Sequence, residues 1–281
     1  MKAWMLLTLI YGLINGAYFL FEKQAMKKNH SIEVLATAIT ISFVLIIWEM
    51  PNAVHINPVY LGLIFLKSLV IFIAWKLSFK ALSKLSVSRY GVINMSRILF
   101  TTMLGFAFLH EVLTVNQLIG MLIVCFGLIM VNILKKDGKK SENNYIIVLL
   151  IGCFFQSVAG LLDKLISTNV TPNIFQWWFL FFLLIINWLY INIRGVNINY
   201  KSVFKNIWIY IYSILFIIGD RLLFMANQIE GSEISIMSLL KQVSVIVTVL
   251  VGGKIFHEKN LKTKFVCSLI IISGIVVITL Y

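Results

Sequence analysis

Two apolar stretches of the sequence each carry a stripe of polar side chains that could bind an anion. The stripes are Tyr90, Asn94, Arg97 and Thr101, and Ser238, Lys241, Ser244 and Thr248. Steps of three and four residues place the members of each stripe on one face of a helix. The guanidinium of Arg97 offers a planar fork to a carboxylate or phosphate, and the ammonium of Lys241 acts as a compact point charge. Both stripes are therefore predicted to line a small-molecule site, in which Arg97 and Lys241 hold a negative group.

The two stripes occupy matched positions in the chain. A shift of 147 residues places Lys241 on Asn94, Ser244 on Arg97 and Thr248 on Thr101. Each copy thus presents one cation, and the two matched positions are one helical turn apart. The alternative is that both cations form internal salt bridges with acidic residues of other apolar stretches. Those acidic residues are Glu22, Asp163 and Asp220.

A third stripe lies in the first apolar stretch and consists of Tyr11, Asn15, Tyr18 and Glu22. A shift of 141 residues relates Asn15 to Gln156 and Glu22 to Asp163. We predict that Asn15, Tyr18 and Gln156 contribute to the same substrate-binding site. Because burial disfavours a charged carboxylate, Glu22 and Asp163 are predicted to couple transport to protons or to act as gate residues. The competing interpretation, which the neighbouring Lys23 and Lys164 favour, is that each carboxylate caps a helix end among the lipid headgroups.

Lys67 is a further candidate for the binding site. It lies roughly 12 Å along the helix that follows Pro58, at about 1.5 Å per residue. A cation at that depth in a membrane span faces the interior of the helix bundle or a water-filled cavity by default.

The composition is that of an integral membrane protein. Sixty per cent of the residues are hydrophobic and 12% are charged, and the mean hydropathy is +0.95. Soluble domains carry about 25% charged residues. The net charge of +13 is therefore assigned to lysines that anchor helix ends at the cytoplasmic surface, and not to nucleic-acid binding. Three cysteines without a Cys-x-x-Cys pair suggest neither a disulfide framework nor a zinc site.

Ten apolar windows have the length of membrane-spanning helices. They cover residues 3–21, 31–48, 59–80, 86–109, 116–134, 145–163, 174–193, 207–225, 235–253 and 265–281. Because the windows are continuously apolar, the predicted fold is an all-α integral membrane protein and not a β-barrel. The shifts divide the chain into a five-helix repeat at 1–134, a linker at 135–144 and a second repeat at 145–281. An odd number of helices per repeat gives two inverted repeats, with a site expected near the midplane between them.

The orientation is predicted from the loop charges. Loops on the side of the N-terminus contain two cationic residues, Lys2 and Lys164, and loops on the opposite side contain sixteen. The positive-inside rule then places both termini outside the cell. We expect the first 25 residues to be retained as a span and not cleaved as a signal peptide, because residues 15–23 have a counterpart at 156–164.

Each predicted repeat closes with an apolar helix, a His-Glu turn and a second, glycine-bearing helix. The first copy contains Gly105, His110-Glu111, Gln117, Gly120 and Gly127; the second contains Gly252, His257-Glu258, Lys264, Cys267 and Gly274. This pattern resembles the EamA-like branch of the drug/metabolite transporter superfamily, although Cys267 replaces the glycine of the first copy. The resemblance implies ten helices and a transport function, and in many relatives the termini are cytoplasmic, contrary to the charge count. In phosphate- and nucleotide-sugar-carrying cousins a basic residue of the ninth helix belongs to the substrate site, and Lys241 looks similar.

The sequence thus predicts a secondary transporter in the cell membrane, expected to be a bacterial inner or plasma membrane. It would move a small organic anion or zwitterion, such as an amino acid, by alternating access through a cavity lined by helices 1, 3, 4, 6, 8 and 9. The alternatives are an exporter of organic cations or amines and a flippase for a polar lipid carrier. A membrane enzyme and a purely structural subunit are other classes, but no nucleophile–base pair or phosphate loop points to an enzyme. No catalytic residue, cofactor, metal site or nucleic-acid partner is predicted, and a homodimer stays open.

Overall fold

The computed structural model describes residues 2–53, 56–109, 115–133, 140–232, 234, 237, 240–241, 243–257 and 261–279, and these residues form helices and no strand. The longer helices are α1 (Ala3–Ala25), α2 (Ser31–Ile46), α4 (Pro58–Lys84), α5 (Val87–Asn94), α6 (Arg97–Leu109), α7 (Val115–Ile133), α8 (Lys140–Ser167), α9 (Pro172–Arg194), α11 (Ile207–Gln228) and α15 (Leu261–Thr279). The short elements are η1 (Ile47–Glu49), α3 (Met50–Ala53), α10 (Tyr200–Lys205), α13 (Val243–Ile246), the π-helical η2 (Val247–Gly252) and α14 (Gly253–Ile255). The expected all-α class is confirmed over the described residues.

Local sequence signals explain where these helices begin and end. Asn57 accepts a hydrogen bond from the backbone N–H of Val59 at 2.9 Å, and Pro58 occupies the first turn of α4. Pro172 likewise begins α9, and Gly195 ends it with a left-handed φ of +59°. Proline suits the first helical turn because its missing N–H has no intrahelical acceptor there, and glycine adopts the left-handed conformation without a Cβ clash.

Six helical segments within the described residues are long and apolar enough to cross a membrane. They are Ala3–Ala25, Ser31–Glu49, Pro58–Lys84, Asn144–Ser167, Pro172–Arg194 and Ile207–Gln228. Leucine, isoleucine, valine and phenylalanine side chains remain exposed on the outer surface, including Phe108, Leu122 and Ile193. Such a surface is stable in contact with lipid. Helices also occupy parts of the other four predicted windows, but the division into ten spans and two inverted repeats stays a prediction.

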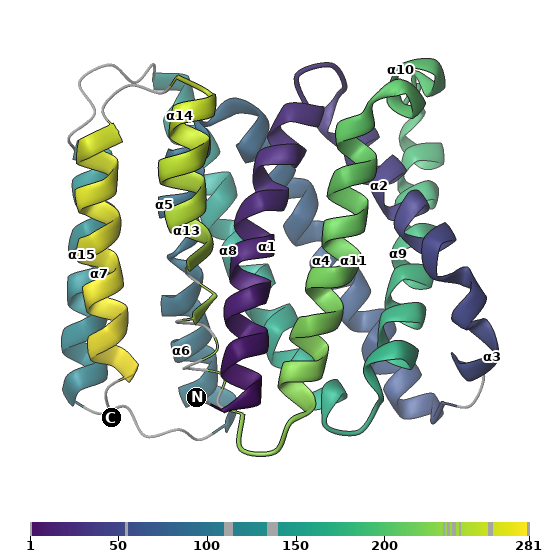
Figure 1. Cartoon of the computed structure of the whole chain (residues 1–281), viewed down its shortest axis with the longest axis horizontal. Coiled ribbons are helices and arrows are strands. Elements are labelled where there is room, and N and C mark those ends of the chain that lie inside the picture. The colour runs from purple at the N-terminus through teal and green to yellow at the C-terminus, as the bar shows by residue number, and fades with distance from the viewer. Residues whose placement is uncertain are drawn as a thin grey trace.

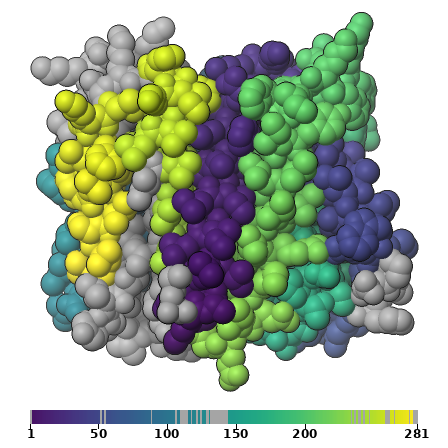
Figure 2. Space-filling view, viewed as in Figure 1, coloured from purple at the N-terminus to yellow at the C-terminus, as the bar shows by residue number. Residues whose placement is uncertain are grey.

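The helices pair reciprocally between the two predicted repeats. α1 packs on α11, α4 on α8, α2 on α9, α5 on η2, and α7 on α15. In Figure 1, α7 and α15 stand together at one end of the bundle, and α1 begins at the same membrane side at which α15 ends. Figure 2 shows α1 on the molecular surface between α11 and the α13–α14 segment. Each helix therefore packs against its partner from the other repeat, as two repeats related by a twofold axis would do.

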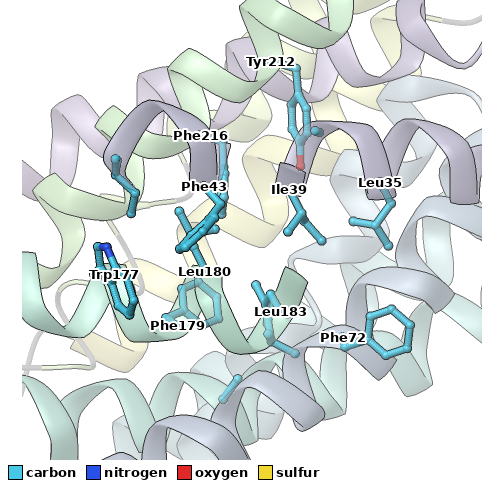
Figure 3. Packing of buried hydrophobic residues seen from close by; sticks show 14 of the residues in the cluster. Leu35, Ile39, Phe43, Phe72, Trp177, Phe179, Leu180, Leu183, Tyr212 and Phe216 are labelled. Carbon is cyan, nitrogen blue, oxygen red and sulfur yellow. The ribbon is translucent and has the colours of Figure 1, made fainter. Parts of the chain in front are cut away.

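An aromatic core fills the space between α2, α4, α9 and α11. Its members include Leu35, Ile39, Phe43, Phe72, Trp177, Phe179, Leu180, Leu183, Tyr212 and Phe216 (Figure 3). The Trp177 and Phe181 rings stack with their centroids 5.4 Å apart, and the Trp75 and Phe216 rings meet edge to face with their centroids 5.2 Å apart. These contacts stabilise the wall of the bundle next to the polar stripes.

The described backbone departs from regular α-helix beside each predicted cation. α5 ends at Asn94 and α6 begins at Arg97, while Lys241 lies in a turn two residues before α13 begins. Backbone hydrogen bonds from Ser96 to Ile93 and from Ser244 to Lys241 span three residues instead of four. The fourth predicted window, 86–109, thus contains two helices, α5 and α6, while part of the ninth window, 235–253, lies outside the described residues. No proline marks either departure, so the apolar periodicity alone did not reveal them.

Small residues allow α1 to lie close to the ninth predicted span. A Cβ at Gly12 would lie 3.1 Å from the Leu240 carbonyl oxygen. A Cβ at Gly16 would lie 2.7 Å from Val247 Cβ and 2.8 Å from the Ser244 carbonyl oxygen. The two glycines, four residues apart on one helix face, thus act as a small-residue contact of the kind that membrane helices use.

We therefore expect Gly16→Ala to lower the free energy of unfolding by about 1–3 kcal/mol, because the added methyl group overpacks this contact. Gly62 is the matched control, since nothing lies within 4 Å of a Cβ at that position. Gly62→Ala should leave stability unchanged or raise it by about 0.5–1 kcal/mol through lower backbone entropy. The measurement is thermal unfolding of the purified protein in detergent. Equal midpoints for the two variants would contradict the close approach.

Candidate functional site

A cavity of about 100 Å³ lies within the helix bundle. Its walls come from α1, α4, α5, α6, α8, α9, α11 and the segment that precedes α13. These elements contain helices 1, 3, 4, 6, 8 and 9 of the predicted order, and α9 adds Phe179 from the seventh. The cavity is thus formed where the two predicted repeats meet.

Nine of the predicted site residues line this cavity. They are Tyr18, Glu22, Lys67, Tyr90, Arg97, Thr101, Gln156, Asp163 and Lys241. Three others belong to its surroundings: Asn15 donates to the Tyr11 hydroxyl at 3.2 Å, Cys153 Sγ donates to Asn94 Oδ1 at 3.4 Å, and Ser244 packs against Gly16. Ser238 lies outside the described residues. The helical stripes were therefore a good guide to the cavity, although Asn94 and Ser244 do not line it.

Further residues of the cavity wall were not predicted as site residues. They include Trp75, Ser78, Phe179, Tyr212, Asp220 and Phe224. Asp220 carried a signal, because a carboxylate within a span is costly and faces the bundle interior by default. The aromatic residues carried none, since spacing cannot separate a cavity wall from a packed core.

Arg97 is fixed in position by neutral polar partners. Its Nη1 donates to Gln156 Oε1 at 3.0 Å, and Gln156 Nε2 donates to Ser78 Oγ at 2.7 Å. The Ser157 hydroxyl donates to the Arg97 carbonyl at 2.9 Å, as does that of Thr101. These bonds connect α4, α6 and α8 at the level of the break between α5 and α6. They hold the guanidinium at the cavity wall without neutralising its charge.

Lys241 has less support than Arg97. Its ammonium lies 5.8 Å from the centroid of the Tyr11 ring, a weak cation–π contact. It lies within electrostatic range of Arg97, Asp163 and Asp220. Among the described residues, however, no carboxylate oxygen comes within 4.0 Å of Lys241 or of Arg97. The alternative that these two cations form internal salt bridges is therefore not what the structure contains.

Lys67 does form an ion pair. Its ammonium lies 3.0 Å from Asp163 Oδ1, and its side chain is 2% exposed. Three phenylalanine rings enclose the same ammonium, with centroids at 3.1 Å for Phe179, 4.9 Å for Phe175 and 5.0 Å for Phe224. Desolvation makes such a buried pair costly to form, but it makes an unpaired Lys67 or Asp163 costlier still. Lys67 thus lines the cavity with its charge already compensated.

The first and sixth predicted spans each contain an adjacent acid and lysine, Glu22-Lys23 and Asp163-Lys164. In both pairs the lysine binds backbone carbonyls. Lys23 donates to the carbonyls of Leu82 and Leu85, the latter at 2.9 Å, at the end of α4. Its counterpart Lys164 donates to the carbonyl oxygens of Asn227 at 3.2 Å and Ser232 at 3.0 Å, near the end of α11. Each lysine therefore binds the unpaired carbonyls at a helix C-terminus of its own predicted repeat.

The acidic members point the other way, because adjacent helical residues diverge by about 100°. Glu22 is 1% exposed, Asp163 is 15% exposed, and both line the cavity. The alternative that each carboxylate caps a helix end among the headgroups is wrong. Whether Glu22 and Asp163 act in coupling or gating stays a prediction.

Arg221 follows the cavity residue Asp220 but belongs to a separate cluster. Its guanidinium forms two bonds with the Glu49 carboxylate, at 2.8 and 2.9 Å, and its Nε donates to Gln176 Oε1 at 2.6 Å. This bidentate pair joins α11 to η1 and α9 and satisfies the charge of Arg221. It does not contribute to the cavity wall.

His257 does not line the cavity. His257 lies in a turn with φ +49°, as expected, whereas His110, Glu111 and Glu258 lie outside the described residues. Cys125, Cys153 and Cys267 are free thiols. Within the described part of the chain, no three His, Cys, Asp or Glu side chains form a group that could hold a metal ion.

The Lys67–Asp163 pair makes a testable prediction about stability. We expect Lys67→Met to lower the free energy of unfolding by about 3–5 kcal/mol, because it leaves the Asp163 charge buried and unpaired. Lys67→Met combined with Asp163→Asn should be more stable than the sum of the single effects implies. Lys205→Met, which removes an exposed lysine, is the control and should change little. Additive effects of the two single substitutions, measured by thermal unfolding, would contradict a coupled pair.

Comparisons with known proteins agree with this architecture. The sequence profile of the EamA-like transporter family matches residues 2–133. No match was found among curated proteins. Of 28 matching chains with solved structures, one crystal structure superposes with a TM-score of 0.65, covers 97% of this chain and 96% of its own, and shares 13% of its residues. That likeness shows a shared fold over nearly the whole chain. Residues 2–133 are thus similar to the EamA-like transporter family, within the drug/metabolite transporter superfamily, and six helical segments of the described residues are long and apolar enough to cross a membrane.

Proposed function

We propose that this protein is a secondary transporter of the cell membrane that moves a small organic anion or zwitterion by alternating access. One observation carries the proposal: Arg97 and Lys241 line a buried cavity, and neither has a carboxylate within 4.0 Å among the described residues. Both side chains are half-buried, and a cation that is partly withdrawn from water without a counter-ion is unfavourable. An anionic ligand that enters the cavity would supply the missing partner.

The contrast with Lys67 and Arg221 strengthens this interpretation. The chain provides Asp163 for Lys67 and Glu49 for Arg221, so its fold can compensate a buried cation where structure alone requires it. Arg97 is instead held by Gln156, an amide that fixes the orientation of the guanidinium and leaves its charge available. Such preorganisation lowers the cost of binding a carboxylate through two parallel hydrogen bonds.

The charges of the cavity favour a zwitterion over a simple anion. Its wall contains the cations Lys67, Arg97 and Lys241. It also contains three carboxylates, those of Glu22, Asp163 and Asp220. With Lys67 and Asp163 paired, two cations and two carboxylates remain, which suits a ligand with one group of each sign, such as an amino acid.

The volume of the cavity favours a compact ligand. The cavity measures about 100 Å³, whereas pockets for drug-sized molecules measure about 300–1,000 Å³. A bulky organic cation or a lipid-carrier headgroup is therefore the less favoured substrate. The aromatic rings and carboxylates of the wall would suit a small amine, and this remains the second candidate.

The arrangement of the helices supports alternating access. The cavity lies between helices that pair reciprocally, and its wall includes Arg97 at the break between α5 and α6 and Lys241 in a turn. Interrupted helices near the substrate site are common in secondary transporters, in which one repeat rocks against the other. The small-residue contact of Gly12 and Gly16 with the ninth predicted span provides a surface along which such a movement could occur.

A thermal-shift screen of the purified protein against small metabolites tests this function, because a ligand that binds only the folded state raises the unfolding midpoint. We expect compact carboxylates and zwitterions to give the largest shifts. Uptake of the ligands so identified, in radiolabelled form, is then measured in proteoliposomes. Arg97→Ala and Lys241→Ala should each weaken binding about tenfold or more, as loss of a charge-assisted hydrogen bond does.

Lys205→Ala is the matched control, since it removes an exposed lysine that does not line the cavity. It should leave binding and uptake unchanged. Intact binding and uptake in both Arg97→Ala and Lys241→Ala would contradict the anion site. Absence of flux for every ligand that binds would instead indicate a membrane receptor or scaffold.

A further inference from the structure

Glu22 is a buried carboxylate whose partner is missing. Its side chain is 1% exposed, it lines the cavity from α1, and its Oε1 accepts no hydrogen bond. No cationic group of the described residues comes within 4.0 Å of it. A carboxylate in this environment needs a cation or a hydrogen-bond donor.

Tyrosine rings surround the same part of the cavity. Tyr18, Tyr90 and Tyr212 line it together with Glu22. The rings of Tyr18 and Tyr212 meet edge to face at 5.5 Å, so they form one continuous wall. Aromatic faces attract ammonium groups, and the attraction increases when water is excluded.

The repeat-related position shows what such a carboxylate binds in this protein. Asp163 corresponds to Glu22, and it holds the Lys67 ammonium at 3.0 Å. The same ammonium is enclosed by the rings of Phe175, Phe179 and Phe224. Asp163 thus binds a cation of the chain itself, Lys67, within a box of aromatic rings. Glu22 shares its part of the cavity with aromatic rings but has no such cation.

We propose that Glu22, together with Tyr18, Tyr90 and Tyr212, forms a binding subsite for the ammonium group of the transported molecule. Glu22 accepts hydrogen bonds from the ammonium, and the rings replace the water that the cation loses on entry. This assignment deepens the proposed function and rests on it: Arg97 and Lys241 take the negative end of a zwitterion, and Glu22 takes the positive end. The Lys67–Asp163 pair is the internal counterpart of the same chemistry.

Three small molecules of similar size separate the two ends of the site. β-Alanine carries an ammonium and a carboxylate, n-propylammonium carries only the cation, and propionate carries only the anion. Binding of each is measured by titration with thermal-shift readout on the purified full-length protein. We expect β-alanine to bind more tightly than either single-charge analogue, and Glu22→Gln to weaken n-propylammonium at least about tenfold while leaving propionate within about twofold.

Two further variants keep the proposal testable if Glu22→Gln is poorly folded. Tyr212→Phe retains the ring and should retain n-propylammonium binding, whereas Tyr212→Leu removes the ring and should weaken it several-fold. Glu230→Gln is the control, because it removes an exposed carboxylate outside the cavity lining. It should leave the binding of all three compounds unchanged.

The outcomes distinguish this subsite from the proposed function. If propionate binding depends on Arg97 and Lys241 but n-propylammonium binding is absent or insensitive to Glu22→Gln and Tyr212→Leu, the ammonium subsite is overturned and the anion site stands. If n-propylammonium binding depends on Glu22 and propionate does not bind, the anion site fails and the protein takes amines. Equal weakening of propionate and n-propylammonium by Glu22→Gln would show a general loss of structure and would also overturn the subsite.

Discussion

The low polarity of the bundle interior dictates how this protein arranges its charges. A cation or carboxylate withdrawn from water must find a counter-ion or hydrogen bonds within the fold. Lys67 finds both Asp163 and three aromatic rings, and Arg221 finds Glu49 and Gln176. Against these compensated charges, the cavity residues Arg97, Lys241 and Glu22 stand out because no ion pair of the described residues satisfies them. The paired charges stabilise the fold, and the charges without an ion pair are the ones available to a ligand.

Helix geometry turns this electrostatic constraint into a site. Adjacent residues on a helix diverge, so Glu22 and Asp163 face the cavity while Lys23 and Lys164 bind carbonyls at the ends of α4 and α11. The bonds of Lys23 to the end of α4 and of Lys164 to the end of α11 thus also orient the neighbouring acids, Glu22 and Asp163, towards the cavity. The breaks beside Arg97 and Lys241 bring irregular backbone to the cavity, where it can be tolerated within a membrane because protein surrounds it.

The sequence predicted much of this arrangement, and the limits have physical causes. Polar residues are rare in membrane spans, so the stripes that contain Arg97 and Glu22 were conspicuous. Nine of the predicted site residues line the cavity. The partner of each buried charge was not predictable. Asp163 was a candidate partner for Arg97 or Lys241 but pairs with Lys67, since its partner depends on how α4 packs against α8. The aromatic cavity wall was also missed, since phenylalanine and tyrosine serve equally in a core. No proline marks the irregular backbone beside Arg97 and Lys241, so the sequence did not reveal it.

The central claim is that Lys241 is present for a ligand and not for the fold. The most direct test is the unfolding midpoint of Lys241→Met, measured without any added ligand. Lys241 has only a distant ring contact with Tyr11, so the free energy of unfolding should stay within about 1 kcal/mol of the wild type or rise. A loss of about 3 kcal/mol or more, as expected for breaking a buried ion pair, would show that Lys241 neutralises a structural charge and would contradict the account.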